Sequence, residues 1–93
     1  VKAVRYPPLG AFILGNRRTA LEPGGLVTAI RVPKRSATGT SAFVKLGARR
    51  YLVISIAMAA ARLVIEDGVV ADAAIAVGAC SAVARRLTGV EAA

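Results

Sequence analysis

The clearest alternation of apolar and polar positions in the first third of the chain runs through residues 26–32, Leu-Val-Thr-Ala-Ile-Arg-Val. A Glu-Pro-Gly-Gly turn signal precedes it at residues 22–25, and Pro33 closes it. Because successive strand side chains point to opposite faces, the pattern predicts a strand with Val27 and Arg31 on the same face.

A second strand is predicted for residues 41–46, Ser-Ala-Phe-Val-Lys-Leu. Phe43 is its only large apolar anchor, and Lys45 shares the side of Phe43 because the two positions are two residues apart. The polar stretch 34–40 separates the two predicted strands. This stretch is the best candidate for a domain boundary.

The next apolar run, residues 53–65, has a mixed pattern: its alanines favour a helix and its Ile and Val residues favour a strand. The Asp67-Gly68 pair decides between them. Asp-Gly between two apolar runs is typical of a type I′ hairpin turn, which needs positive φ at both central residues. With the alternating return run 70–78, the sequence predicts a long antiparallel hairpin.

Both ends of the chain give weaker signals. Residues 1–16 contain two prolines and two glycines and predict an irregular connection. Residues 88–91, Thr-Gly-Val-Glu, have a capping-box pattern, in which the Thr88 hydroxyl and the Glu91 carboxylate satisfy the first N–H groups of a helix. A helix of one turn is unstable in water, and the sequence stops at Ala93, so we expect a chain cut at both ends.

The composition predicts a thin core. Apolar residues make up 56% of the 93 residues, but there are only two Phe and two Tyr and no Trp. Ala and Val supply much of the apolar content and bury little area each. A domain of this size buries only about two-thirds of the surface that its unfolded chain exposes, so we expect part of the apolar surface to be an interface.

The formal net charge of +8 suggests nucleic-acid binding, because counterion release rewards clustered cations. The placement argues against it, since there is no sustained basic run and no interleaved aromatic residue for base stacking. The cations therefore more often belong to a solvated surface or to one that faces a partner protein. Binding of an anionic cofactor or a phosphate is the intermediate possibility. The cations occur mainly as separated pairs: Arg17-Arg18, Lys34-Arg35, Arg49-Arg50 and Arg85-Arg86.

The inventory of reactive side chains is short. There is no His, so histidine acid–base chemistry and the usual metal clusters are not expected. Cys80 is the single cysteine and has no internal disulfide partner, which fits a reducing, cytoplasmic compartment. The uncharged stretch 51–61, like every other in the chain, is short of the roughly 20 residues that span a bilayer. These features predict a soluble protein without a catalytic centre of its own.

Three stretches together carry a resemblance to a known family. The first is FILGNRRTALEPGGLVTAI at residues 12–30, followed by Arg-Val-Pro, and the second is SAFVKLGARR at 41–50. The third is the Asp67-Gly68 hairpin with ADAAIAVGACSAVARRL after it. In this order and spacing they resemble the flavin-binding subunit of the molybdenum hydroxylases, the family of xanthine dehydrogenase and carbon monoxide dehydrogenase.

The resemblance implies an α+β fold in two parts. Residues 1–35 would close the FAD-binding domain. Residues 36–93 would open the C-terminal domain of the carbon monoxide dehydrogenase flavoprotein with a three-stranded antiparallel sheet that contains the hairpin. The Gly-rich loops that hold the FAD pyrophosphate in the family lie upstream of the matched stretches and are absent here.

The resemblance also implies a role in electron transfer. The parent subunit passes electrons from molybdenum and iron–sulfur centres through FAD to an acceptor, in a hetero-oligomer with a molybdenum-binding large subunit and an iron–sulfur small subunit, which hold the molybdopterin and the Fe–S clusters. Lys45 matches a lysine near the flavin ring, where a cation would tune the flavin potential. Val27 matches an apolar residue that lies against the isoalloxazine.

Two positions depart from the family pattern. Gly25 stands where relatives usually have an acidic residue, and Val53 stands where many have Asp. Both departures leave the local hydrogen bonding around the matched strands open. Each matched residue also has a plain interpretation: Lys45 as a surface lysine covering Phe43 with its stem, and Val27 as a core valine.

Two other functions stay open from the sequence. One is a small basic module that binds nucleic acid, marked by binding that weakens steeply with salt. The other is a structural assembly domain that never touches flavin.

Overall fold

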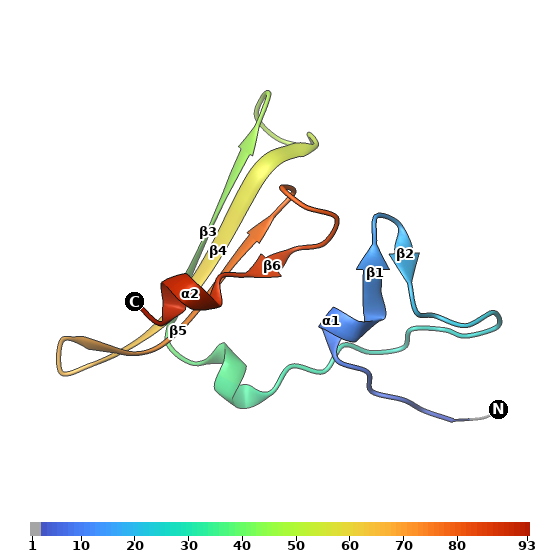
Figure 1. Cartoon of the computed structure of the whole chain (residues 1–93), viewed down its shortest axis with the longest axis horizontal. Coiled ribbons are helices and arrows are strands. Elements are labelled where there is room, and N and C mark those ends of the chain that lie inside the picture. The colour runs from blue at the N-terminus through green and yellow to red at the C-terminus, as the bar shows by residue number, and fades with distance from the viewer. Residues whose placement is uncertain (1–2) are drawn as a thin grey trace.

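A four-stranded antiparallel sheet occupies the second half of the chain in the computed structural model, which describes residues 3–93 (Figure 1). The fold is α+β, as predicted, but the sheet has four strands rather than three. The additional strand is only two residues long, so it leaves no alternation in the sequence. In order across the sheet the strands are β3 (Thr40–Gly47), β4 (Ser55–Glu66), β5 (Val69–Gly78) and β6 (Arg85–Arg86).

The predicted hairpin is confirmed as β4 and β5. Asp67 and Gly68 have φ of 52° and 75°, the positive values that a type I′ turn requires. β4 pairs with β3 on one side and with β5 on the other, so both rows of its backbone groups find partners. This double pairing explains why the Ala-rich run is a strand despite its helix propensity.

The strand predicted for residues 26–32 is wrong. These residues have no regular secondary structure, and Ile30 is 87% exposed. Alternation measures only how well a segment fits a half-buried sheet surface, and a strand also needs a neighbour to bond its backbone. No strand among residues 3–93 pairs with this segment.

The N-terminal part is less irregular than predicted for residues 1–16. A single helical turn, α1 (Leu9–Phe12), leads into β1 (Ile13–Gly15), which pairs with β2 (Arg18–Thr19) in a separate two-stranded sheet. Arg17 takes the left-handed φ of 56° in the tight turn between them. Residues 1 and 2 lie outside the described residues.

The polar stretch 34–40 contains a 3₁₀ turn, η1 (Lys34–Ala37), and leads directly into β3. At the other end, α2 (Thr88–Glu91) begins after Leu87, and no side chain caps its first turn. The predicted capping box is therefore wrong. The Glu91 carboxylate instead binds groups on the neighbouring strands, which offer it a backbone N–H and a guanidinium.

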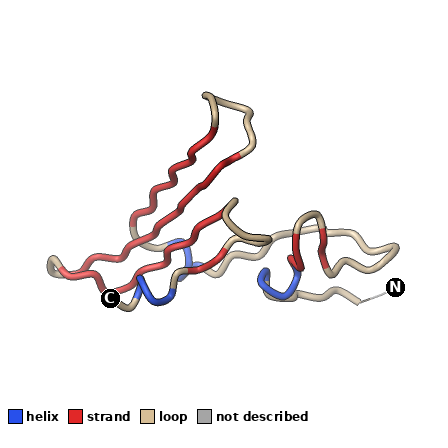
Figure 2. Tube along the Cα trace, turned by 45° about the horizontal axis from the view of Figure 1, so that its top comes forward, coloured by secondary structure: helices blue, strands red, loops and turns tan. Residues whose placement is uncertain are grey.

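The described residues lack a hydrophobic core. Gly78 alone is buried, and no apolar side chain is. The Cα radius of gyration is 16.1 Å, against about 12 Å for a compact domain of this length. Figure 2 shows the reason: the sheet is a single open layer, and the one helical turn within residues 3–93 that lies against its long strands is α2, beside β5.

The two faces of the sheet differ in chemistry. Cross-strand pairing and strand alternation place only apolar side chains on one face along most of the three long strands, here called the apolar face. Its members are Ala42, Val44, Leu46, Ala57, Ala59, Ala61, Leu63, Ala73, Ile75 and Val77. The opposite face mixes small and charged side chains, here called the mixed face. Its members include Ser41, Phe43, Lys45, Ala60, Arg62, Asp72, Ala74, Ala76 and Arg86.

Replacing Gly39 by Ala is expected to loosen the start of β3. Gly39 has φ of +82°, and an added Cβ would overlap the carbonyl oxygen of Leu63. The left-handed conformation alone costs a residue with a Cβ about 1–2 kcal/mol, so the amides of β3 and β4 should exchange about 5- to 30-fold faster. Hydrogen–deuterium exchange measured by mass spectrometry reports the rates.

Gly10→Ala is the matched control, because a Cβ at Gly10 meets nothing within 4 Å. Equal exchange of β3 in the two variants would contradict the assigned role of Gly39.

Candidate functional site

Lys45 lies near the end of β3 on the mixed face, where β3 leads into the loop of residues 48–54. Its ammonium group donates a hydrogen bond to the backbone carbonyl of Val53 at 2.7 Å. Val53 therefore supplies an oxygen acceptor to Lys45 through its backbone. The side chain of Lys45 remains exposed, so its other two donors can reach a ligand or a partner.

The loop after β3, residues 48–54, presents cations and apolar side chains together. Arg49 and Arg50 are exposed, and Tyr51 and Leu52 follow with φ of 59° and 38°. Left-handed φ is uncommon for bulky residues and marks a turn or a strained segment. Leu52 is 97% exposed. Exposed aromatic, aliphatic and arginine side chains are typical of a surface that a partner covers.

A hollow of about 760 Å³, here called the alanine trough, lies on the mixed face. Its floor comes from small side chains of β4 and β5, and residues 36–39 form one wall. Phe43 stands at the β3 side, and Arg62 and Arg86 supply cations. The other lining residues are Ser36, Ala37, Thr38, Gly39, Ser41, Ala60, Ala74 and Ala76, and the hollow is also bordered by Ala42 and Ala61, whose side chains belong to the apolar face.

Arg62 joins three segments around the trough. Its guanidinium donates to the Thr38 carbonyl at 3.1 Å and to the Asp72 carboxylate at 2.8 Å. The hydrogen bond and the positive charge of Arg62 lower the pKa of Asp72. The side chain of Arg62 therefore fastens residues 36–39 over the mixed face of β4 and β5.

Glu91 fastens α2 to the sheet. Its carboxylate accepts two hydrogen bonds from Arg86, at 2.6 and 2.8 Å, and one from the backbone N–H of Ile75 at 2.8 Å. The hydrogen bonds from Arg86 and from Ile75 lower the pKa of Glu91 to about 2. The hydrogen bond to Glu91 in turn raises the pKa of Arg86. The Glu91 side chain is only 13% exposed, so water competes little for this carboxylate.

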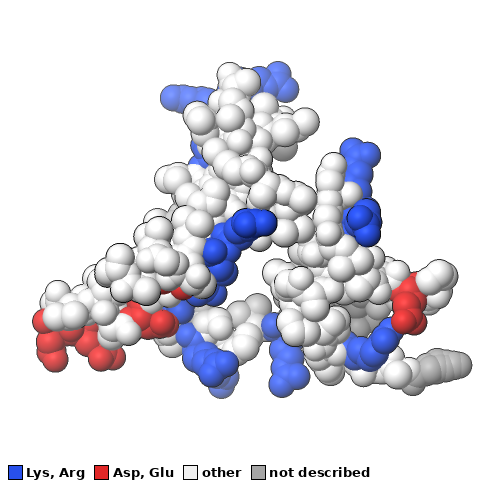
Figure 3. Space-filling model, in the orientation of Figure 1, with Lys and Arg blue, Asp and Glu red and all other residues white. Residues whose placement is uncertain are grey.

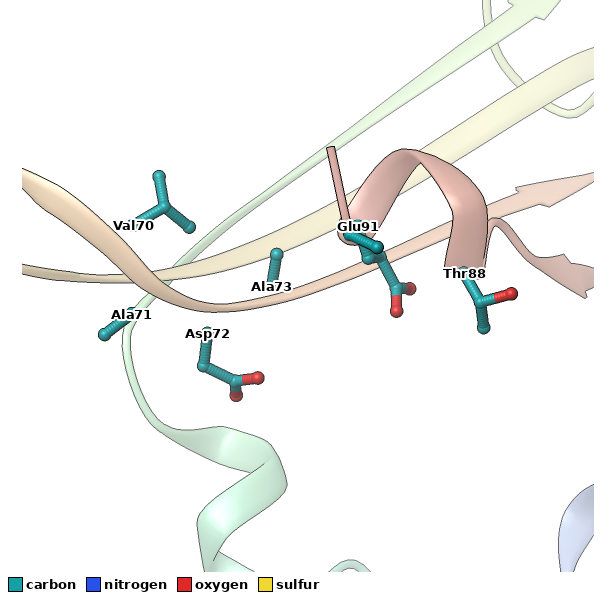
Figure 4. Close-up of a pocket in the computed structure, with 7 residues that line it drawn as sticks. Val70, Ala71, Asp72, Ala73, Thr88 and Glu91 are labelled. Atoms are coloured by element: carbon teal, nitrogen blue, oxygen red, sulfur yellow. The ribbon is translucent and has the colours of Figure 1, made fainter.

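A smaller hollow of about 310 Å³ lies between α2 and β5. Figure 4 shows the Asp72 and Glu91 carboxyl groups and the Thr88 hydroxyl around it. Each carboxylate is already bound by an arginine. The hollow is therefore a gap between docked elements with no free charge to attract a cation.

Val27 lies in the irregular segment between β2 and η1 and is 53% exposed. Figures 1 and 2 show this segment on the side of β1 and β2, away from the β3–β4 end of the sheet that carries Lys45. The structure does not bring Val27 and Lys45 together.

Charge is unevenly spread over the molecule. Figure 3 shows Lys and Arg side chains over the sheet and the N-terminal part, whereas Asp and Glu side chains gather at the β4–β5 turn and beside the N-terminal coil. The β4–β5 turn carries Glu66 and Asp67, and the β3–β4 loop at the other end of β4 carries Arg49 and Arg50. The sheet therefore has an acidic end and a basic end.

Within residues 3–93, no set of three Cys, Asp or Glu side chains is placed to hold a metal ion. Cys80 is exposed and unpaired. No helix in the described part of the chain is long and apolar enough to cross a membrane. The alanine trough and the hold of Arg62 on residues 36–39 were not predicted, because they join segments far apart in sequence.

Comparison of the chain with protein-family models, curated proteins and solved structures found no match.

Lowering the pH is expected to release α2 from the sheet. Because the pKa of Glu91 is lower in the folded chain than its ordinary value of 4.5, the docking is complete above about 4.5 and is lost as the pH falls toward about 2. The NMR shift of the Ile75 amide, followed from pH 6 to pH 2, measures this change.

Glu91→Gln should abolish the acid transition of Ile75 and move its amide shift at pH 6 toward the acid value. Glu66→Gln, an exposed carboxylate on the β4–β5 hairpin, is the control and should leave the transition in place. A midpoint near 4.5 in the parent chain would contradict the assigned contacts of Glu91.

Proposed function

We propose that this chain is part of the flavin-binding subunit of a molybdenum hydroxylase, where it contributes to one wall of the flavin site and to subunit contacts. The resemblance of the three stretches is the basis of this proposal. Its support from the geometry is the position of Lys45, whose ammonium lies 2.7 Å from the Val53 carbonyl at the open, basic end of the sheet. A cation held at an exposed strand end is available to an anionic group from outside the chain.

The share of the flavin site that this chain offers is small. Lys45 suits a negatively charged group, since it brings a cation with free donors. The described residues provide no phosphate-binding loop, and Val27 lies on the side of β1 and β2, away from Lys45. The main FAD-binding loops would therefore come from the rest of the subunit. When bound, FAD would supply the electron transfer between the molybdenum side and the acceptor.

The apolar face supports the subunit-contact part of the proposal. Its three long strands carry Val, Leu, Ile and Ala side chains with no charged residue among the ten named members. An apolar area of this kind is favourable to cover with further protein. We infer that other domains of the flavoprotein subunit, or the molybdenum and iron–sulfur subunits, cover it.

The visible spectrum of the complete subunit, purified under mild conditions, tests the proposal first. It should show oxidised flavin bands, and denaturation should release FAD. In this subunit Lys45→Ala should lower the flavin reduction potential by roughly 30–60 mV, because a charge-assisted hydrogen bond worth about 1.5–3 kcal/mol is lost.

Lys45→Arg keeps the cation and should hold the potential near the parent value, and Lys34→Ala is the control for a lysine outside the sheet. Colourless protein that also fails to take up FAD would contradict the flavin proposal. Flavin that binds with an unchanged potential in Lys45→Ala would favour an assembly domain without flavin contact, the function that the exposed apolar face supports.

A further inference from the structure

The long outer strand β3 is an unprotected sheet edge. β3 is the first strand of the sheet and pairs only with β4, which leaves one row of its backbone N–H and C=O groups without a strand partner. All its residues from Thr40 to Leu46 are exposed, and Phe43 is 60% exposed. Folded proteins rarely leave such an edge bare, because it templates pairing with another strand.

The usual protections of an edge are missing here. β3 contains no proline, and its pairing with β4 runs without a bulge from Thr40 to Leu46. Its one charged side chain, Lys45, turns back to the Val53 carbonyl. Residues 36–39 lie over the mixed face, where Arg62 holds Thr38, and so they leave the edge of β3 open.

The opposite edge of the sheet is treated differently. β6 covers the end of β5, and Leu87 donates its N–H to the Ile75 carbonyl at 2.8 Å. The outward N–H of Ile75 is bound by the Glu91 carboxylate. The chain therefore closes the Ile75–Val77 part of that edge itself, whereas within residues 3–93 β3 has no strand on its outer side from Thr40 to Leu46.

We propose that the edge of β3 pairs with β3 of a second copy of this chain, antiparallel and centred on Phe43. A two-fold axis at Phe43 places residues whose numbers sum to 86 opposite each other, so Lys45 faces Ser41 and Leu46 faces Thr40. Opposed residues then share a face of the joined sheet, as an antiparallel pair requires. No like charges meet, and the apolar faces of the two copies become continuous.

Charge complementarity selects a second copy as the partner. In this register Arg49 of one copy is level with residue 37 of the other, three residues before Thr40. Glu66 is also three residues beyond Leu63, the partner of Thr40. The basic end of one copy, which carries Arg49, therefore meets the acidic end of the other, which carries Glu66, about two strand spacings or roughly 10 Å apart across the joined sheet. The two-fold axis repeats this pairing of a basic end with an acidic end.

The oligomeric state of the full 93-residue chain tests the proposal. Analytical ultracentrifugation should show a dimer whose formation slows the amide exchange of residues 40–47. Glu66→Lys and Arg49→Glu should each raise the dissociation constant about 2- to 20-fold, as expected for two surface ion pairs. The double variant should restore it, and unchanged circular dichroism would show that the sheet is intact.

Crosslinking tests the register. In a Cys80→Ser background, Phe43→Cys should form an oxidised dimer, because the two residues face each other at about 5 Å between Cα atoms. Val44→Cys is the control, since its two copies are offset by two residues and lie roughly 8 Å apart. A monomer at all concentrations, equal crosslinking at both positions, or protection of the apolar face with β3 left open would overturn the proposal.

Discussion

The whole arrangement depends on the backbone pairing of β4 with its two neighbours. Within residues 3–93, β4 is the only long strand with partners on both sides over most of its length, and the β3–β4 and β4–β5 ladders hold the sheet together. Hydrogen bonds of this kind contribute modestly to stability, since the unfolded chain bonds equally to water. The stability of a sheet comes mainly from the apolar area it covers, and here no layer covers it.

This missing layer explains the distribution of the other interactions. With no buried apolar side chain, the elements at the margins of the sheet are fixed by ionic hydrogen bonds instead. Arg62 binds Asp72 and Thr38, and Arg86 binds Glu91. These contacts position residues 36–39 and α2, but they do not replace a core. Further protein could bury the apolar face and pair with the edge of β3, and so supply the covering layer and the strand partner that these two surfaces lack.

Local signals predicted the sheet well and the interactions between distant segments poorly. The Asp67-Gly68 turn fixed the hairpin, because its positive φ angles are a property of two adjacent residues. The strand at 26–32 failed because alternation cannot say whether a neighbour exists. Glu91 shows the same limit at the candidate site. The sequence predicts that its carboxylate caps a helix together with Thr88, whereas in the fold it binds the Ile75 N–H and the Arg86 guanidinium. Lys45 was predicted as a flavin-site residue from the resemblance alone. Its hydrogen bond to the Val53 carbonyl is visible only in the structure.

The central claim is that the described residues, 3–93, form a sheet without a core of their own, and differential scanning calorimetry of the chain tests it most directly. A core-bearing domain of this length unfolds in one sharp transition with a heat-capacity increase of about 1.1–1.4 kcal/mol/K. The account predicts a broad transition with an increase well below that range. A single sharp transition with the full increase, measured at a concentration where the chain is monomeric, would contradict it.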